Sequence, residues 1–342
     1  MKVLIRCDSS NIIGTGHVMR CLNLASYYPD YKFTFVCRNF NMNIAEKIKE
    51  NNHTLILLDY TLEPEINNYV SWLGKDYNEE KRQILDIVTK IQYDIIIIDH
   101  YGFDYKLEKE LVEFCGKLVV VSDIFDFNHY CHLFINYNCD DLQKVKMINL
   151  KKETEYKIGA KNIIINKKFI ESNKKRHFNE AIQTITINMG GSDPQNFILK
   201  TLQIINDFIV KNEITVNIVV GKSNGNTLSI VDFVRNAKNY ALFYNLNYDD
   251  LIDLYLKTDL AIGSLSITAY ERLYLNIPQI CLKIIDNQLI QELDEFHITK
   301  IDGLMKKILE YNNIIKSYSI KSNETGVPNV TSLLTFLPNI SQ

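Results

Sequence analysis

Short aliphatic runs recur along the chain, separated by polar loops and by segments with helical spacing. In the first half they predict strands at 3–7, 32–37, 53–58, 94–99, 117–121 and 132–135, with helices at 18–28, 42–51, 79–92 and 105–114. Continuous apolar runs joined by helical crossovers are typical of a parallel sheet covered on both faces. The first half is therefore predicted to be a Rossmann-like, doubly wound α/β domain.

The same rhythm restarts after two polar, lysine-rich segments at 140–155 and 167–180. Strands are predicted at 184–189, 215–221, 240–246, 260–263 and 279–284, and helices at 194–208, 228–237, 249–257, 266–275 and 287–296. We therefore expect two Rossmann-like domains, 1–158 and 159–342, the second ending in a helix and an irregular tail. Ligands of open α/β sheets bind beyond the carboxyl ends of the strands, so the loops there are the first place to search.

Charge and composition narrow the function classes. The chain carries 38 Lys and Arg against 41 Asp and Glu, a net charge of −3, which argues against binding of nucleic acid. No apolar run approaches the roughly 18 residues of a membrane span, and the first residues lack the apolar core of a signal peptide. Seven cysteines without a CxxC pair are typical of reduced thiols. We expect a cytoplasmic protein without stable membrane association, a monomer or a weak oligomer.

Two of only 13 glycines, Gly14 and Gly16, lie between the first strand and the first helix. Glycine lets the backbone approach a ligand closely, and the following helix N-terminus suits an anion. His17 falls in the first helical turn, where the helix dipole favours the neutral imidazole that a general base requires; alternatively, it caps the turn. Arg20, one turn later, is expected to pair with Asp8, or else to form a solvated or structural ion pair. Asp8, Gly14, Gly16 and Arg20 are all expected to bind the substrate.

A second glycine pair, Gly190 and Gly191 followed by Ser192, stands between a predicted strand and helix, with Pro194 at the expected first helical position. It predicts a second anion cradle, against a plain turn. Small hydroxyl residues follow another strand, and such side chains cap helices or bind phosphate oxygens. Glu271, in the helix after them, is a carboxylate that could accept ribose hydroxyls, or else a solvated helix residue. The hydroxyl residues at this junction are Ser264 and Ser266.

Tyr101 lies in the segment Asp99-His100-Tyr101-Gly102, which ends a buried strand at the place where α/β enzymes position ligand-facing side chains. The alternative for this segment is a polar strand end with a glycine turn. A further stretch holds metal-capable side chains, but their spacing matches no zinc pattern, so neither a metal site nor a cofactor is predicted. These side chains are His129, Cys131, His132 and Cys139.

Taken together, these motifs resemble the nucleotide-sugar hydrolases of pseudaminic acid synthesis, which hydrolyse UDP-2,4-diacetamido-2,4,6-trideoxy-β-L-altropyranose. The resemblance runs from residue 1 to about 288 and is carried by RCDSSNIIGTGHVMRCLNLA, Trp72-Leu73-Gly74, IIIDHYG, the His129-x-Cys131 stretch, NMGGSDPQN and YERLYLNIPQICLKIIDNQ. The first motif is highly specific, whereas the GGS and Glu…Asn-Gln elements are shared with MurG-like glycosyltransferases.

The resemblance implies a GT-B fold, in which two Rossmann-like domains face a cleft, the second holding UDP and the first presenting the sugar to His17. The family's catalytic histidine and active-site tyrosine fall on His17 and Tyr101. Its nucleotide-binding acid and the following Asn-Gln pair fall on Glu271, Asn287 and Gln288.

The expected function is therefore metal-independent hydrolysis of a UDP-sugar by water, with C–O cleavage and inversion, in a nonulosonic acid pathway that feeds surface or flagellin glycosylation. A GT-B glycosyltransferase that hands the sugar to an acceptor is the alternative, and a catalytically silent binding protein is a third class that intact His17 and Tyr101 disfavour. Departures from the family pattern at Ser122, Phe127, Asn166 and 323–330 leave the sugar's identity open.

Overall fold

The structure is a computed structural model of residues 1–342, and it describes all of them except 173–176, 192, 236, 284–293 and 324–342. The described chain divides into two compact units, the first of residues 1–164 and the second beginning at Ile165. Each unit is built on one parallel sheet, of seven strands in the first and five in the second. The predicted α/β class, with two doubly wound domains, is confirmed.

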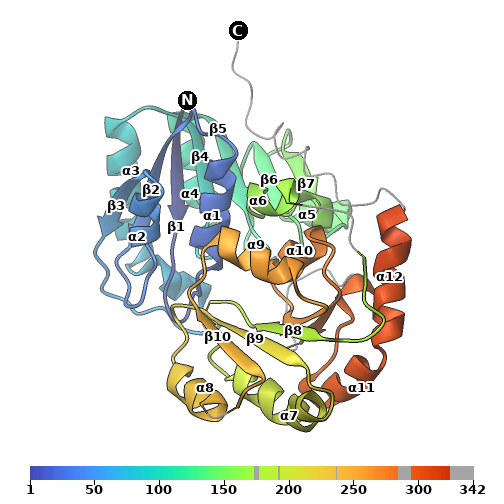
Figure 1. Ribbon diagram of the computed structural model, residues 1–342. Helices are drawn as coiled ribbons and strands as arrows, with labels where there is room; N and C mark the ends of the chain where they lie inside the picture. Colours follow the sequence, from blue (N-terminus) through green and yellow to red (C-terminus); the bar gives the residue numbers. More distant parts are fainter. Residues whose placement is uncertain (173–176, 192, 236, 284–293, 324–342) are drawn as a thin grey trace. The chain divides into compact units, whose positions relative to one another are not determined.

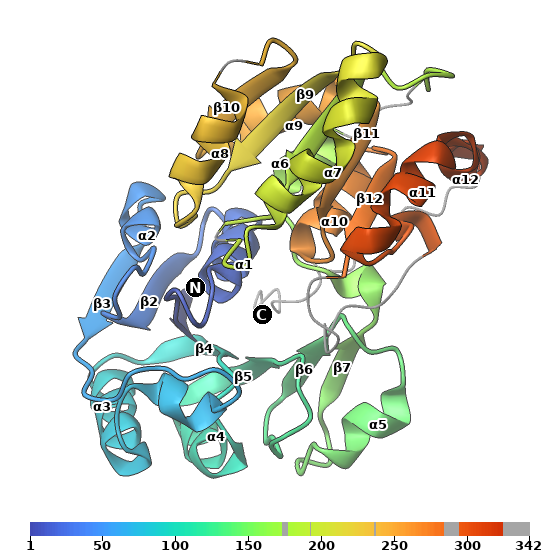
Figure 2. The ribbon, with the colours of Figure 1, turned by 90° about the horizontal axis from the view of Figure 1, so that it is seen from below.

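The first unit has the strand order β3-β2-β1-β4-β5-β6-β7, so the order reverses between β1 and β4. Helices α1 and α2 lie on one face of this sheet and α3 and α4 on the other (Figure 2). The strands are β1 (Lys2–Cys7), β2 (Lys32–Arg38), β3 (Thr54–Leu58), β4 (Tyr93–Asp99), β5 (Cys115–Val121), β6 (Leu133–Asn136) and β7 (Glu155–Ile158). The helices are α1 (Gly16–Ser26), α2 (Glu46–Glu50), α3 (Tyr77–Lys90), α4 (Tyr105–Leu111) and α5 (Leu142–Met147), with 3₁₀ helices at Tyr69–Leu73, Val112–Phe114 and Ala160–Asn162.

Two elements of this unit differ from the prediction. Strand β7 begins at Glu155, where the sequence predicts the end of a polar linker. Within the described chain it is an edge strand that pairs with β6 alone, and because it is only partly buried it lacks an apolar run. The helix predicted at 42–51 is much shorter, because Met42 has a φ of 57°, in the left-handed region, and no helix can begin there.

The second unit has the order β10-β9-β8-β11-β12, with its reversal between β8 and β11. Helices α7 and α8 cover one face of the sheet, and α9 and α10 the other (Figure 1). The strands are β8 (Thr184–Asn188), β9 (Thr215–Val220), β10 (Tyr240–Tyr244), β11 (Leu260–Ser264) and β12 (Gln279–Leu282). The helices are α6 (Lys167–Glu171), α7 (Phe197–Lys211), α8 (Thr227–Val234), α9 (Tyr248–Leu256), α10 (Ile267–Tyr274), α11 (Leu304–Leu309) and α12 (Tyr311–Asn323), with 3₁₀ helices at Asp294–Phe296 and Ile301–Gly303.

Helix α7 begins at Phe197 and not at Pro194 as predicted, because Asp193 and Asn196 both adopt positive φ, at 46° and 55°. The helix predicted at 287–296 lies mostly outside the described residues. No helix among the described residues is long and apolar enough to cross a membrane.

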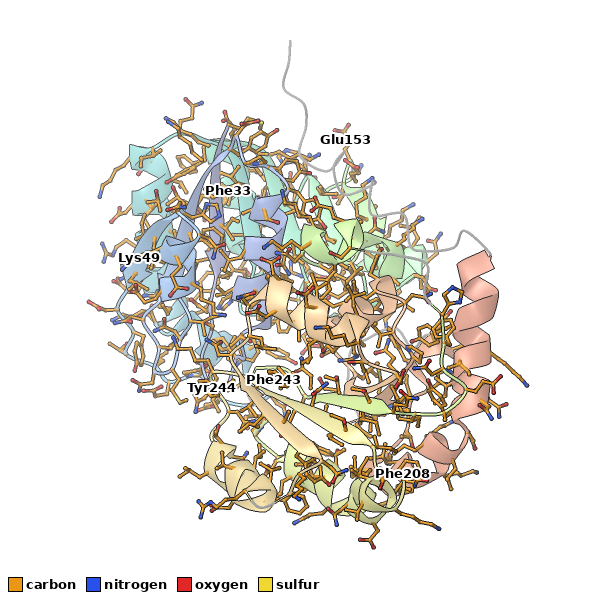
Figure 3. The ribbon with its side chains drawn as sticks, viewed as in Figure 1. Phe33, Lys49, Glu153, Phe208, Phe243 and Tyr244 are labelled. Atoms are coloured by element: carbon orange, nitrogen blue, oxygen red, sulfur yellow. The ribbon has the colours of Figure 1, made fainter. Side chains whose placement is uncertain are left out.

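Each sheet has its own apolar core. Side chains of β1, β4 and β5 form the core of the first unit, and those of β8, β9 and β11 form the core of the second. Phe208 of α7 packs against the second core, whereas Lys49 of α2 lies on the surface of the first unit (Figure 3). With the strands fixed in this way, the loops at their carboxyl ends are held by burial of the sheet beneath them.

Candidate active site

His17 is placed at the carboxyl edge of the first sheet by the glycine motif. The chain leaves β1, makes a tight turn in which the Gly14 N–H donates to the Ser10 carbonyl over 2.9 Å, and enters α1 at Gly16. Gly14 has a φ of +79°, which a residue with a Cβ rarely adopts. A Cβ added at Gly14 or Gly16 would meet no atom within 4 Å, so there is open space beside the helix start.

A buried carboxylate fixes the imidazole of His17. The Nδ1 atom of His17 lies 2.6 Å from Oδ1 of Asp99, the last residue of β4, and Asp99 is fully buried. Burial would raise the pKa of Asp99, but the Arg20 guanidinium and His17 reverse this and hold that pKa well below its usual range. The ionised Asp99 accepts the Nδ1–H proton, which leaves Nε2 as the basic nitrogen of the neutral ring. Among the described residues, Nε2 has no hydrogen-bond partner.

Arg20 pairs with the same carboxylate. Its Nε and one terminal nitrogen bond both oxygens of Asp99, and the other terminal nitrogen lies 2.7 Å from Oδ2 of Asp123 and 2.5 Å from the Tyr137 hydroxyl. The predicted pairing of Arg20 with Asp8 is therefore wrong. His17 and Arg20 are three residues apart on α1, so they share one helix face and meet the same partner at the end of β4.

Asp8 belongs to a different network. Its side chain is fully buried, with Oδ2 lying 2.7 Å from Arg6 and 3.1 Å from His100, and Oδ1 accepting the backbone N–H of Arg38 over 2.5 Å. These contacts tie β1, β2 and the end of β4 together. The substrate-binding role expected of Asp8 stays a prediction that these contacts do not support.

Tyr101 lies against His17. The two rings meet edge to face with centroids 4.7 Å apart, while the Tyr101 ring stacks on Trp72 at 5.6 Å. The Tyr101 hydroxyl donates to Oδ2 of Asp123 over 2.8 Å. Burial, and then the charge of Asp123, raise the pKa of Tyr101 well above its usual value, so the phenol keeps its proton. The next residue, Gly102, lets the Tyr69 backbone approach closely, because a Cβ at Gly102 would lie 2.6 Å from the Tyr69 carbonyl oxygen.

Two residues of this site were not singled out from the sequence. Asp99 lies inside the motif that contains Tyr101, and Asp123 inside a segment read only as a departure from the family. Both follow buried apolar runs, and β4 and β5 are adjacent in the sheet. An acidic residue at the ends of two neighbouring parallel strands is the signal that could have identified them. We call His17, Arg20, Asp99, Tyr101 and Asp123 the Arg20 cluster.

The glycine pair of the second unit follows β8 as predicted, but the start of α7 is already capped. Asp193 accepts the backbone N–H groups of Phe197 and Ile198 over 2.7 and 2.9 Å, so these amides are not available to a bound anion. The first amides of α7 are therefore not part of an anion cradle, and the cradle expected at the glycine pair itself stays a prediction. The glycine loop itself remains open, since a Cβ at Gly190, whose φ is +89°, would meet no atom within 4 Å. Ser192 lies outside the described residues.

The start of α10, unlike that of α7, has no side-chain cap. Ser266 occupies the N-cap position but makes no side-chain cap; its hydroxyl instead pairs with those of Ser264 and Thr268, at 2.9 and 2.8 Å. Within the described part of the chain, the backbone N–H groups of Ile267 and Thr268 have no hydrogen-bond partner. Such a helix start attracts an anion.

Glu271, in the second turn of α10, is 4% exposed, and no described residue donates a hydrogen bond to its carboxylate. Burial raises its pKa to about 7, although the neighbouring Arg272 opposes the rise. Arg272 is fully buried, and its Nε donates to Gln279 over 2.7 Å. A nearly buried carboxylate without a donor lies in the same helix as two unpaired amides. Asn287 and Gln288 lie outside the described residues.

The metal-capable stretch has structural partners. His129 lies 2.8 Å from the carboxylate of Glu108, and Nδ1 of His132 accepts the Leu118 N–H over 2.9 Å. Cys131 is buried, whereas Cys139 is only partly buried. Among the described residues, no group of three or more His, Cys, Asp or Glu side chains is arranged to hold a metal ion.

Comparison with curated proteins identifies two relatives. Over 283 residues the chain is 27% identical to the UDP-2,4-diacetamido-2,4,6-trideoxy-β-L-altropyranose hydrolase of Campylobacter jejuni, which covers 82% of this chain and 92% of that protein. Over 310 residues it is 26% identical to an uncharacterized protein of Methanocaldococcus jannaschii, covering 88% of this chain but spanning only 59% of that relative's length. No protein-family model matches the chain.

Solved structures share the fold at low sequence identity. MurG of Acinetobacter baumannii is 11% identical, with a TM-score of 0.57 and 97% of each chain covered. The UDP-GlcNAc 2-epimerase of Neisseria meningitidis, bound to UDP-GlcNAc, is 9% identical, with a TM-score of 0.54 and 98% of each chain covered. The chain has the GT-B fold. Its resemblance to the UDP-2,4-diacetamido-2,4,6-trideoxy-β-L-altropyranose hydrolases is confirmed by the Campylobacter relative.

Proposed function

We propose that the protein hydrolyses a UDP-linked 2,4-diacetamido-2,4,6-trideoxy hexose to UDP and the free sugar, as a step in pseudaminic acid or related nonulosonic acid biosynthesis. The observation that carries the proposal is the His17–Asp99 pair, which leaves Nε2 of a buried imidazole without a partner among the described residues. The glycine turn before His17 is open, since a Cβ at Gly14 or Gly16 would meet no atom within 4 Å. The similarity to a protein named for this hydrolysis supports the choice of substrate.

In the proposed reaction, Nε2 of His17 takes a proton from a water molecule while the water oxygen forms a bond to the anomeric carbon. The bond between that carbon and the diphosphate oxygen breaks, and its electron pair leaves with UDP. A positioned general base of this kind typically accelerates a reaction by about 10²–10⁴-fold. Attack opposite the leaving group inverts the anomeric centre.

The charges around His17 suit this step. Asp99 and Asp123 are two carboxylates around one guanidinium, so one negative charge is left uncompensated in a buried site. That charge stabilises the imidazolium formed when the water loses its proton, because charges interact strongly where water is excluded. It also favours the positive charge that develops on the sugar ring as the leaving group departs.

The second unit is proposed to bind the nucleotide. The unpaired N–H groups of Ile267 and Thr268, with the hydroxyls of Ser264 and Ser266, suit the diphosphate, and the Glu271 carboxylate suits the two ribose hydroxyls. The Gly190–Gly191 loop gives the backbone room to approach the phosphates. By resemblance, Asn287 and Gln288 complete this site. UDP is a good leaving group, so the proposal needs no metal ion.

The test uses the purified full-length protein, the UDP-sugar, EDTA and no acceptor, and measures free UDP and free sugar over time. Equimolar release of both, lost in a folded His17→Ala protein, is the expected result. UDP release that requires an added acceptor would instead identify a glycosyltransferase. Release only after Mg²⁺ is restored would contradict the metal-free reaction.

A further inference from the structure

Toward a bound water or substrate, the Tyr101 hydroxyl can only accept a hydrogen bond. Its proton is already donated to Oδ2 of Asp123, 2.8 Å away, and burial together with the Asp123 charge keeps the phenol protonated. A phenol that donates its single proton to a carboxylate retains oxygen lone pairs that accept hydrogen bonds. Tyr101 therefore has nothing left to donate to a sugar oxygen or a leaving group, but its oxygen can accept from a water molecule.

Asp123 is itself held so that it must accept from Tyr101. Its Oδ2 atom receives the Tyr101 hydroxyl and lies 2.7 Å from Arg20, while its Oδ1 atom is buried and has no partner among the described residues. Asp123 is 4% exposed, so bulk water does not replace these bonds. A buried carboxylate left with one unpaired oxygen would not tolerate the loss of a donor without a large penalty.

Arg20 connects this pair to the catalytic base. One guanidinium bonds Asp99, which fixes the His17 ring, and Asp123, which fixes the Tyr101 hydroxyl. The His17 and Tyr101 rings meet at 4.7 Å. These two contacting rings each carry an acceptor, the Nε2 atom of His17 and the hydroxyl oxygen of Tyr101. A water molecule has two protons to donate, and it presents a lone pair once both are directed toward acceptors.

We propose that Asp123 is a positioning residue, which holds the Tyr101 hydroxyl proton so that the phenol oxygen accepts one hydrogen bond from the attacking water while His17 accepts the other. The inference rests on the proposed hydrolysis and deepens it. The water proton on the His17 side moves to Nε2 during attack, and the proton on the Tyr101 side stays on the oxygen that becomes the new sugar hydroxyl. In this role Asp123 acts through the Tyr101 hydroxyl.

The test compares kcat and KM for the UDP-sugar in the wild type, Asp123→Asn, Tyr101→Phe and the double variant. Each single change is expected to lower kcat on the order of 10- to 100-fold, the range of a lost hydrogen bond to a charged or reacting group, with KM within about threefold. In the double variant the loss should not exceed that of the worse single change, because Asp123 acts through Tyr101. Glu108→Gln is the matched control: it removes another buried carboxylate of the first unit, and its folded protein should keep kcat within about threefold.

Each remaining result is decisive. Wild-type kcat in Asp123→Asn, or losses that multiply in the double variant, would overturn the positioning role while leaving the hydrolysis intact. A wild-type protein that releases no UDP would overturn the proposed function, and this inference with it. If Asp123→Asn does not fold, Tyr101→Phe decides alone, since its ring keeps the packing on His17 and Trp72; an unchanged kcat there would refute the proposal.

Discussion

The Arg20 cluster and the α10 site both contain buried carboxylates, but they differ in whether those carboxylates have hydrogen-bond donors. In the Arg20 cluster, Asp99 and Asp123 both bond a guanidinium, and the histidine and tyrosine are oriented by these carboxylates. The α10 site comprises Ser264, Ser266, Ile267, Thr268 and Glu271. There Glu271 is almost as deeply buried, but no described residue donates to it, and the Ile267 and Thr268 amides also have no partner among the described residues. In the first site the charged side chains hold one another in place before a ligand arrives, whereas the second holds polar groups that a ligand would satisfy.

This difference separates catalysis from binding. Preorganised charges act on a transition state without rearranging, so a base and its supports need to be in place before the substrate arrives. A binding site can leave groups unsatisfied, because the ligand's own hydroxyls and phosphates compensate them and this compensation contributes to affinity. Changes in the Arg20 cluster should therefore appear in kcat, and changes in the α10 site in affinity.

The largest effect is expected from His17→Ala. Loss of the base should lower kcat about 10²–10⁴-fold while the affinity for UDP stays within a few-fold, because the nucleotide is assigned to the second unit. Steady-state turnover and calorimetric titration with UDP measure the two quantities. Wild-type turnover in a folded His17→Ala protein would exclude His17 as the base.

Asp99→Asn should produce the next largest loss in kcat, on the order of 10²-fold or more, because an amide does not select the Nδ1–H tautomer and leaves Arg20 with one ion-pair partner fewer. The affinity for UDP should again be unchanged. If Asp99→Asn raised KM and left kcat intact, Asp99 would belong to substrate binding and not to the base.

The next prediction concerns Glu271 and the pH dependence of UDP affinity. Burial raises the pKa of its carboxyl group to about 7. The ionised form is the better acceptor of hydrogen bonds from the ribose hydroxyls. UDP affinity should therefore rise as the pH increases from 6 to 8, and the rise should be smaller in Glu271→Gln, where only the ligand's own phosphate titrates. The variant should bind UDP about tenfold more weakly at pH 8. Titration calorimetry at three pH values measures both. Equal pH dependence in the two proteins would place Glu271 outside the ribose site.

The smallest expected effect is that of Glu271→Gln on the thermal stability of the ligand-free protein. The folded-state pKa of Glu271, about 7, lies above the ordinary value of 4.5, so the folded protein binds this proton more tightly than the unfolded chain does. Its contribution to stability is full below pH 4.5 and is lost as the pH rises through 7, at about 1.4 kcal/mol per pH unit at most. Glu271→Gln without ligand should therefore gain in melting temperature relative to the wild type between pH 5 and pH 8. A constant difference across that range would contradict the buried, uncompensated carboxylate.

Much of this arrangement follows from local sequence. Buried runs such as 95–98 predict the central strands, and the glycine motif predicts a helix start that carries His17. The edge strand β7 and the short helix α5 escape prediction, because neither has an apolar run or a full amphipathic period. Sequence reasoning also finds Tyr101, at the end of a predicted strand.

Pairing partners are harder to predict than elements. Asp8 and Asp99 both follow or end neighbouring strands, and the choice of Arg20 between them depends on the direction in which α1 faces. The bond from Arg20 to Asp123 joins residues 103 positions apart, and that from His17 to Asp99 joins residues 82 apart. Asp193 precedes the N-cap residue Asn196, and its side chain reaches the first amides of α7 through a backbone in which both residues have positive φ. Because neither residue is glycine, no local sequence pattern predicts this backbone.

The central claim is that His17 directs water to the anomeric carbon, and turnover in ¹⁸O-labelled water tests it most directly. The account predicts that the label appears in the released sugar and not in UDP, and that the first anomer formed is opposite to the one bound in the substrate. Mass spectrometry of both products and rapid NMR of the sugar give these results. Label in the UDP phosphate would show attack at phosphorus and contradict the account, and retention at the anomeric carbon would require a covalent intermediate that this mechanism does not contain.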